Sequence, residues 1–242
     1  MSKFLYTFFH NETNDKTEKG QNIIPSDRSL WPEAWRIVTY KEYTNFSHIA
    51  LPKPKGILFE SLLTKRASKI EKLKYNAVTI ENIAYILACG SGIRDKSLGE
   101  ERTAPSAGAR YPLETYVCLF KECENLKCGI YHYNVRINAL EPVLLKEFTK
   151  EEKSSFFVIP DFDDVSFIVC ITAILNRTVQ KYGSRGYRFI LLESGHVAQN
   201  MLLAATEKGL TGIPLGGINE NIIENYIGIQ NGDERVLYAI SF

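Results

Sequence analysis

The fold is decided by residues 181–217, which read KYGSRGYRFILLESGHVAQNMLLAATEKGLTGIPLGG. Apolar residues in the middle of this stretch recur at three- and four-residue steps, and this spacing predicts a long helix. Several positions between those steps are also apolar, so we expect the helix to be buried on most sides. Glu193, His196 and Asn200 interrupt the apolar run, which excludes a membrane span. Gly209 is expected to end the helix as its C′ residue, and His196 to be a hydrogen-bonded core residue rather than a catalyst.

The composition limits the classes of function. The chain has 242 residues, enough for one large domain or two small ones. Its 29 Lys and Arg residues against 28 Asp and Glu residues leave a net charge of +1, which gives no indication of binding to nucleic acid or to an anionic membrane. The N-terminus lacks the pattern of a signal peptide, and no apolar run reaches membrane length. The sequence therefore predicts a soluble, cytoplasmic protein that binds neither nucleic acid nor membrane.

The five cysteines favour reduced thiols, because their number is odd and no CxxC pair occurs. The even spacing of Cys118, Cys123 and Cys128 suggests a metal site at first. However, Cys118 falls inside an apolar strand, and the nearby His132 lacks zinc-finger spacing. We therefore expect no metal site.

The order of the predicted elements favours an α+β domain over a doubly wound sheet, because strands and helices are mixed without a regular βαβ alternation. Residues 1–55 are expected to form an irregular N-terminal arm over a domain of residues 56–242, since Pro52 and Pro54 block regular pairing. Helices are predicted at 57–65, at 80–89 between an N-cap Thr79 and Gly90, after the capping box of Thr149 and Glu152, and at 220–227. Strands are predicted at 113–120, 129–134, 139–145, 164–175 and 236–242, with the second and third as a hairpin and the fourth as a central strand.

Three segments have the residue types of a ligand-binding site. Arg66 and Ser68 follow a helix and could bind a phosphate, although a solvated basic helix end explains them equally well. The loop at 102–112 has small residues between two prolines, and its two arginines, Arg102 and Arg110, raise the expectation of a bound anion; the alternative is a simple turn. Residues 214–217, PLGG, would leave backbone N–H groups free to contact a flat ligand. No GxGxxG, GxxxxGK[ST] or GxSxG motif is present.

A fourth segment has the residue types of a proton-transfer site. Lys181 and Tyr182 could act as a pair if burial or neighbouring cations lower the pKa of the lysine toward neutrality. The alternative is a surface pair beside the turn residue Gly183, which the residues alone favour.

Taken together and in this order, these segments resemble the flavin-dependent nitroreductase superfamily, and within it the SagB-type dehydrogenases, the flavin subunits of azoline-forming peptide-modification complexes. The resemblance is carried by RTAPSAGARYPLETYV (102–117), GIYHYN (129–134), KYGSRGYRFILLESGHVAQNMLLAATEKGL (181–210) and PLGG (214–217). Weaker similarity at FHNET, TYKEY, LPKP and KRAS extends it over nearly the whole chain.

The resemblance implies a nitroreductase-like α+β fold with a central mixed sheet flanked by helices. It also implies a long buried central helix and a homodimer that holds FMN at the subunit interface. Residues 56–242 would form the FMN-binding domain, and residues 1–55 the arm.

Site residues follow from the resemblance by position. Arg66 and Ser68 are expected to hold the FMN phosphate and the pyrimidine edge. The partner subunit is expected to supply a loop, and a backbone N–H of the glycine segment is expected to lie beside the flavin N5 atom. The loop residues are Pro105, Ser106, Ala107, Gly108 and Arg110, and the glycine-segment residues are Leu215, Gly216 and Gly217.

Two departures from the family pattern matter. Ala67 and Ile70 replace residues that are commonly polar in simple nitroreductases. The chain also ends at Phe242, without the C-terminal extension that in many relatives supplies a phosphate-binding Lys or Arg. Arg185, Arg188 or Arg235 is expected to take that role, and Arg185 is counted among the cofactor-binding residues.

The resemblance implies oxidation of a thiazoline or oxazoline in a ribosomally made peptide to a thiazole or oxazole. Lys181, assisted by Tyr182, would remove the ring Cα proton while a hydride passes to the flavin, and oxygen would reoxidise the flavin. The expected partners are the peptide substrate and a cyclodehydratase complex. Two alternatives remain open. One is an NAD(P)H-dependent flavin reductase that acts on nitro, quinone or dehydroamino acid substrates, and the other is a non-enzymatic scaffold of a cyclodehydratase complex.

Overall fold

A computed structural model describes residues 5–13, 28–30, 59–73, 78–94, 101–124, 126–158, 162 and 165–242. The boundary predicted at residue 55 and most of the predicted arm lie outside these residues. Within the arm, residues Leu5–Thr13 form helix α1 and Arg28–Leu30 a 3-10 turn. The expectation of an irregular arm is therefore wrong for residues 5–13.

The sheet has six strands in the order β3-β2-β1-β4-β6-β5. Each recorded pairing between neighbouring strands is antiparallel, so the prediction of a mixed sheet is wrong for the described part of the chain. Parallel neighbours need long crossover connections, whereas antiparallel neighbours do not. The predicted hairpin of β2 and β3 is antiparallel, and β2 pairs with β1 in the same way. The strands are β1 (Leu113–Leu119), β2 (Gly129–Asn134), β3 (Ala139–Leu145), β4 (Phe167–Ile174), β5 (Ile213–Leu215) and β6 (Glu234–Ser241).

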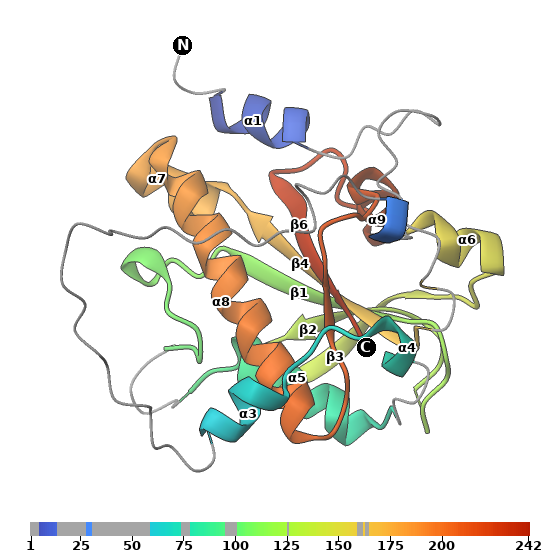
Figure 1. The fold of residues 1–242 in the computed structure, drawn as a ribbon. Helices are drawn as coiled ribbons and strands as arrows, with labels where there is room; N and C mark the ends of the chain where they lie inside the picture. The colour runs from blue at the N-terminus through green and yellow to red at the C-terminus, as the bar shows by residue number, and fades with distance from the viewer. Residues whose placement is uncertain are drawn as a thin grey trace.

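Helices cover both faces of the sheet (Figure 1). The side chains of β1 and β4 alternate between two cores: Val117 and Val169 pack with helices α5 (Ile80–Ser91) and α8 (Arg185–Glu207). Cys118 and Cys170 point to the other face, which is covered by α9 (Glu220–Ile227) and the end of α6 (Lys150–Ser155). Because both faces are covered, β1 and β4 are buried almost throughout, as the sequence predicts for central strands.

Local signals set several helix ends as predicted. The Thr79 hydroxyl accepts a hydrogen bond from the Asn82 N–H, and Thr149 and Glu152 form the predicted capping box. Gly209 has φ 73°, and the Leu210 N–H donates to the Ala205 carbonyl at 2.8 Å in a Schellman motif. Helix α5 continues past Gly90 to Ser91, two residues beyond the predicted end at residue 89.

Helix α8 departs from the prediction in its exposure. Only one face is buried, while Leu192 is 57% exposed and Leu191 38% exposed on the opposite face. His196 is exposed as well, so the expectation of a core histidine is wrong. The sheet and α5 lie on the same side of α8. Helix α3 also contacts α8, but the described residues of one chain leave Leu191 and Leu192 exposed.

Three short helices complete the description: α3 (Phe59–Lys65), α4 (Ile70–Leu73) and α7 (Asn176–Tyr182). Helix α7 is absent from the sequence prediction, which names only Lys181 and Tyr182 among its residues. Helix α1 is held against the start of α8, where His10 Nδ1 lies 2.7 Å from the buried Tyr187 hydroxyl. No helix of the described residues is both long enough and apolar enough to cross a membrane.

The packing of α5 on α8 leads to a stability prediction. A Cβ atom on Gly90 would lie 2.4 Å from Cγ of the fully buried Met201. Replacing Gly90 with Ala is therefore expected to lower the free energy of unfolding by about 1–2 kcal/mol, because the added methyl group overpacks the contact. Helix propensity alone would raise the free energy of unfolding by about 1 kcal/mol. The sign of the change measured by urea denaturation therefore distinguishes overpacking from helix propensity. A rise in stability would contradict the close helix contact.

Candidate functional site

The predicted loop and the predicted Lys–Tyr pair meet in the same chain. Gly108 has φ 61°, and a Cβ atom there would lie 2.4 Å from the Tyr182 hydroxyl and 2.7 Å from Lys181 Nζ. The left-handed φ favours glycine at this position, and a Cβ atom would force the ends of the Tyr182 and Lys181 side chains to move. The neighbouring Ala109 and Tyr111 also have positive φ, at 53° and 45°, which is strained backbone for residues with a side chain. Strain of this kind is concentrated at functional sites.

The Lys–Tyr pair is only partly enclosed. The Tyr182 ring lies edge-on to Phe189, with centroids 5.2 Å apart, and is half-buried. Lys181 Nζ lies 5.3 Å from the centroid of the Tyr182 ring and is exposed to solvent. The described part of one chain therefore does not supply the burial that the proton-transfer prediction requires of Lys181.

A buried carboxyl group that the sequence analysis treats only as an interruption of the helix holds the loop in place. The Ser106 hydroxyl donates to Glu193 Oε2 at 2.6 Å and accepts from the Tyr111 N–H at 2.8 Å. Glu193 lies on the buried face of α8 and is only 5% exposed. Its spacing from Ile190 and Val197, three and four residues away, places it on the core face of the predicted helix, and this was the signal that could have identified it.

Burial raises the pKa of Glu193 to about 7, although the hydrogen bond from Ser106 and the charge of Arg102 oppose the shift. At pH values below about 7 the folded chain therefore favours a neutral carboxyl group at this position. The loop that carries Gly108 is thus tied to α8 by a group that titrates near neutral pH.

Arg66 and Ser68 lie together, as predicted for a phosphate site. Arg66 Nη1 is 3.4 Å from the Ser68 hydroxyl, and this is the side-chain contact that Arg66 makes among the described residues. The pair directly follows α3, which contacts α8. Figure 1 shows α3 and α7 toward opposite ends of α8, so Arg66 and the Lys–Tyr pair belong to separate regions of one chain. The free guanidinium nitrogens and the hydroxyl suit an oxyanion.

The glycine segment lies at the edge strand β5. Leu215 ends the strand, and the Gly217 carbonyl accepts a hydrogen bond from the Val158 N–H at 3.0 Å. Gly216 is exposed, and an added Cβ atom would meet nothing within 4 Å. The backbone is therefore open to the approach of a flat ligand, as the resemblance implies for a flavin ring.

The remaining predicted phosphate ligands do not gather around Arg66. Arg185 and Arg188 line an apolar cavity of about 770 Å³ between α1 and the start of α8, and neither Arg66, Ser68 nor Gly216 lines that cavity. Arg235 Nη1 donates to the Glu234 carbonyl at 2.6 Å. Arg110 Nε donates to the Arg177 carbonyl at 2.8 Å. The structure brings Gly108 of the loop together with Lys181 and Tyr182, and leaves Arg66 with Ser68 as a second group.

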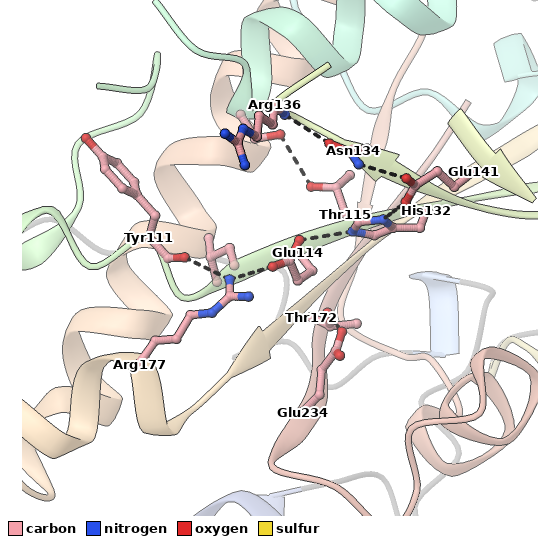
Figure 2. Close-up of polar contacts among 12 residues, drawn as sticks. Tyr111, Glu114, Thr115, His132, Asn134, Arg136, Glu141, Thr172, Arg177 and Glu234 are labelled. Atoms are coloured by element: carbon pink, nitrogen blue, oxygen red, sulfur yellow. Dashed lines mark hydrogen bonds and ion pairs between the residues drawn. The ribbon is translucent and has the colours of Figure 1, made fainter. Parts of the chain in front are cut away.

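A network of hydrogen-bonded side chains that the sequence analysis missed crosses the sheet beside the loop (Figure 2). Glu114 binds the Arg177 guanidinium through one oxygen and His132 Nε2 at 3.0 Å through the other, and His132 Nδ1 is 2.9 Å from Glu141. The hydrogen bond to Glu114 raises the pKa of His132. Burial opposes ionisation of Glu114, but the hydrogen bonds to His132 and Arg177 outweigh it and lower the pKa of Glu114. The register of the predicted hairpin, which pairs His132 with Glu141, was a usable signal.

Four of the five cysteines are buried, and Cys89 is partly exposed. Cys118 and Cys170, on neighbouring strands, have sulfur atoms 3.9 Å apart, and both are fully buried. Among the residues that the structure describes, no group of three or more His, Cys, Asp or Glu side chains could hold a metal ion.

The raised pKa of Glu193 leads to a pH prediction. Between about pH 4.5 and 7 the folded chain keeps a proton that the unfolded chain has lost, so this group makes stability fall as the pH rises through that range. Replacing Glu193 with Gln is expected to remove this dependence. Relative to wild type, the free energy of unfolding of the variant should rise by on the order of 2–3 kcal/mol between pH 5 and pH 8. Urea denaturation at pH 5 and pH 8 measures it, with the exposed Glu147→Gln as the control. An unchanged pH dependence in the Glu193 variant would refute the assignment.

Comparisons with known proteins identify the family of this chain. Residues 63–242 match the model of the nitroreductase family. MJ1384 of Methanocaldococcus jannaschii, whose given name places it among nitroreductases, is 32% identical over 187 residues, covering 75% of this chain and 90% of that protein. The microcin B17-processing protein McbC of Escherichia coli is 28% identical over 211 residues, covering 83% of this chain and 68% of McbC.

The solved structures show the same fold. The structure of the E. coli microcin synthetase McbBCD complex with truncated pro-MccB17 bound contains a chain that superposes with a TM-score of 0.78. The match covers 98% of this chain and 90% of that chain at 22% sequence identity, which is evidence for the fold alone. The α+β, nitroreductase-like fold predicted from the sequence is confirmed. The family match, the relative at 32% identity and the shared fold together make this chain an oxidoreductase of the nitroreductase family.

Proposed function

We propose that the protein is an FMN-dependent dehydrogenase of the SagB type, which oxidises thiazolines or oxazolines in a ribosomally made peptide. The contact of Lys181 and Tyr182 with Gly108 carries this proposal, since it places a base candidate against the loop that the resemblance assigns to the flavin. The similarity to McbC, named as a processing protein for microcin B17, supports a peptide substrate.

The residues present are compatible with FMN. Arg66 and Ser68 would hold the phosphate, because the guanidinium has nitrogens left over after its contact with Ser68. The open backbone at Gly216, with Leu215 and Gly217 on either side, would lie against the ring. The loop from Pro105 to Arg110 would cover it from the other side. When bound, FMN would supply the acceptor for the hydride that leaves the azoline ring.

Lys181 would remove the ring proton of the azoline, and Tyr182 would orient the lysine. Their positions are fixed by the short helix α7 and by the close contact with Gly108. Lys181 is exposed in one chain, so the bound ring and a second chain would have to exclude water from it.

A homodimer would complete such a site. The Arg66 group and the Lys–Tyr group belong to regions near opposite ends of α8 (Figure 1). In a two-fold dimer that packs α8 against its copy about an axis perpendicular to the helix, the two helices run antiparallel, so opposite ends meet. The exposed apolar residues Leu191 and Leu192 on this face favour such packing.

The proposed setting is the cytoplasm, with a cyclodehydratase complex as the partner. The fold match to a chain of the microcin synthetase complex with a bound pro-peptide supports a complex of this kind. The absence of a membrane-crossing helix in the described residues is compatible with this setting.

A second candidate function is an NAD(P)H-dependent reductase of nitro, quinone or dehydroamino acid substrates. It is favoured by the similarity to MJ1384, which extends over 90% of that protein. The absorption spectrum after anaerobic addition of NADPH separates the two candidates. The dehydrogenase is expected to keep its oxidised flavin spectrum, and a reductase would bleach rapidly.

The role of Lys181 is tested by replacement with Ala. Turnover of a thiazoline peptide is expected to fall by about 100-fold or more, because the base is lost, while the flavin stays bound. The exposed Lys127, in the connection between β1 and β2, provides the matched control, and Lys127→Ala should keep wild-type turnover. Wild-type turnover in the Lys181 variant would remove the base assignment.

A further inference from the structure

A polar cavity lies beside the loop, and Arg110 is the residue of its wall that the proposed flavin site also uses. Its volume is about 400 Å³, and three arginines contribute to its wall: Arg102, Arg110 and Arg177. Tyr111 and Glu114 also line it. Two of the arginines are those that bracket the loop in the sequence, and the third lies in the first turn of α7, the helix that carries Lys181 and Tyr182.

The arginines keep most of their hydrogen-bonding capacity. Arg102 donates through Nη1 to the Leu113 carbonyl at 3.4 Å, and Arg110 donates through Nε to the Arg177 carbonyl at 2.8 Å. Arg177 donates through Nη1 to the Tyr111 carbonyl at 3.3 Å and to Glu114. Each guanidinium therefore uses one nitrogen for contacts within the described residues and has the others left for a ligand.

The charges in the cavity do not cancel. Glu114 is the carboxylate in the cavity wall, and it is already bound to Arg177 and His132. Three guanidinium groups face one carboxylate, which leaves the cavity positively charged. Three guanidinium groups around one cavity suit an oxyanion group of a ligand.

We propose that Arg102, Arg110 and Arg177 form a subsite for a carboxylate group of the peptide substrate, an acidic side chain or the C-terminus. The proposal rests on the proposed function, which supplies the peptide. Ala109, Arg110 and Tyr111 line the cavity, and the adjacent Gly108 touches Lys181 and Tyr182. A peptide anchored here would pass the Lys–Tyr pair within a few residues of its carboxylate.

The subsite would act on substrate choice rather than on the reaction. A planar guanidinium fork binds a carboxylate through two parallel hydrogen bonds, so it would favour a peptide with an acidic residue at a fixed distance from the azoline. A Gln side chain in place of Glu would lack the charge, and its NH₂ group would face the N–H groups of the arginines. We therefore expect the subsite to discriminate between Glu and Gln at least tenfold.

The test is binding, measured without turnover. The ¹⁵N-labelled full chain with its flavin is titrated with N-acetyl-glutamate methylamide and with its glutamine analogue, and the arginine Nε–H resonances are followed by NMR. The glutamate probe is expected to shift the resonances of Arg102 and Arg177, at least tenfold more tightly than the glutamine probe. Arg177→Gln should weaken this binding at least tenfold, and the exposed Arg110→Gln gives a second variant if Arg177→Gln does not fold.

The control is Arg136→Gln, an exposed arginine in the β2–β3 turn that lies outside the cavity wall and should leave binding unchanged. Equal binding of both probes, or the same loss in Arg136→Gln, would overturn the subsite. Tighter binding of inorganic phosphate than of the glutamate probe would overturn the carboxylate assignment in favour of a phosphate ligand. Because binding is measured without turnover, the result of this titration can be interpreted even if the protein does not oxidise azolines.

Discussion

One-sided burial of α8 is the constraint on which the rest of this structure depends. The sheet and α5 cover the face that carries Ile190, Val197 and Met201, and these side chains are almost completely buried. The opposite face keeps Leu191 and Leu192 in contact with water, which is unfavourable in proportion to the apolar area exposed. A second copy of the chain would remove this area from water. The same packing would bring the Arg66–Ser68 group of one chain close to the Lys181–Tyr182 pair of the other. Stability and function would then depend on one interface.

Within one chain, α8 also determines the shape of the loop. Glu193 holds Ser106, and Ser106 holds the Tyr111 N–H, so the segment between them is closed on the helix. The left-handed backbone at Ala109 and Tyr111 costs on the order of 1 kcal/mol at each residue. The hydrogen bonds of Ser106 with Glu193 and of Arg110 and Arg177 with backbone carbonyls offset this cost. The result is a loop that reaches Lys181 and Tyr182 at Gly108.

Signals that depend on neighbours in the sequence predicted much of the fold. The capping residues Thr79 and Thr149, the C′ residue Gly209 and the hairpin of β2 and β3 all depend on contacts within a few residues. The exposure of His196 and the antiparallel sheet could not be predicted in this way, because each depends on which distant element lies alongside. The family resemblance assigned Gly108 and the Lys–Tyr pair to the same flavin site, but it did not predict their direct contact. Arg177 was missed because its partners, Glu114 and Tyr111, are more than 60 positions away in the sequence.

Sedimentation velocity tests the central claim, that a second copy of the chain completes a flavin site, because it records protein mass and flavin absorption in the same boundary. The account predicts that the visible flavin absorption sediments with a species of twice the 27.5 kDa of one chain. It also predicts that Arg66→Ala loses the flavin absorption. Flavin that sediments with a single chain, or a colourless protein that does not take up added FMN, would contradict the account.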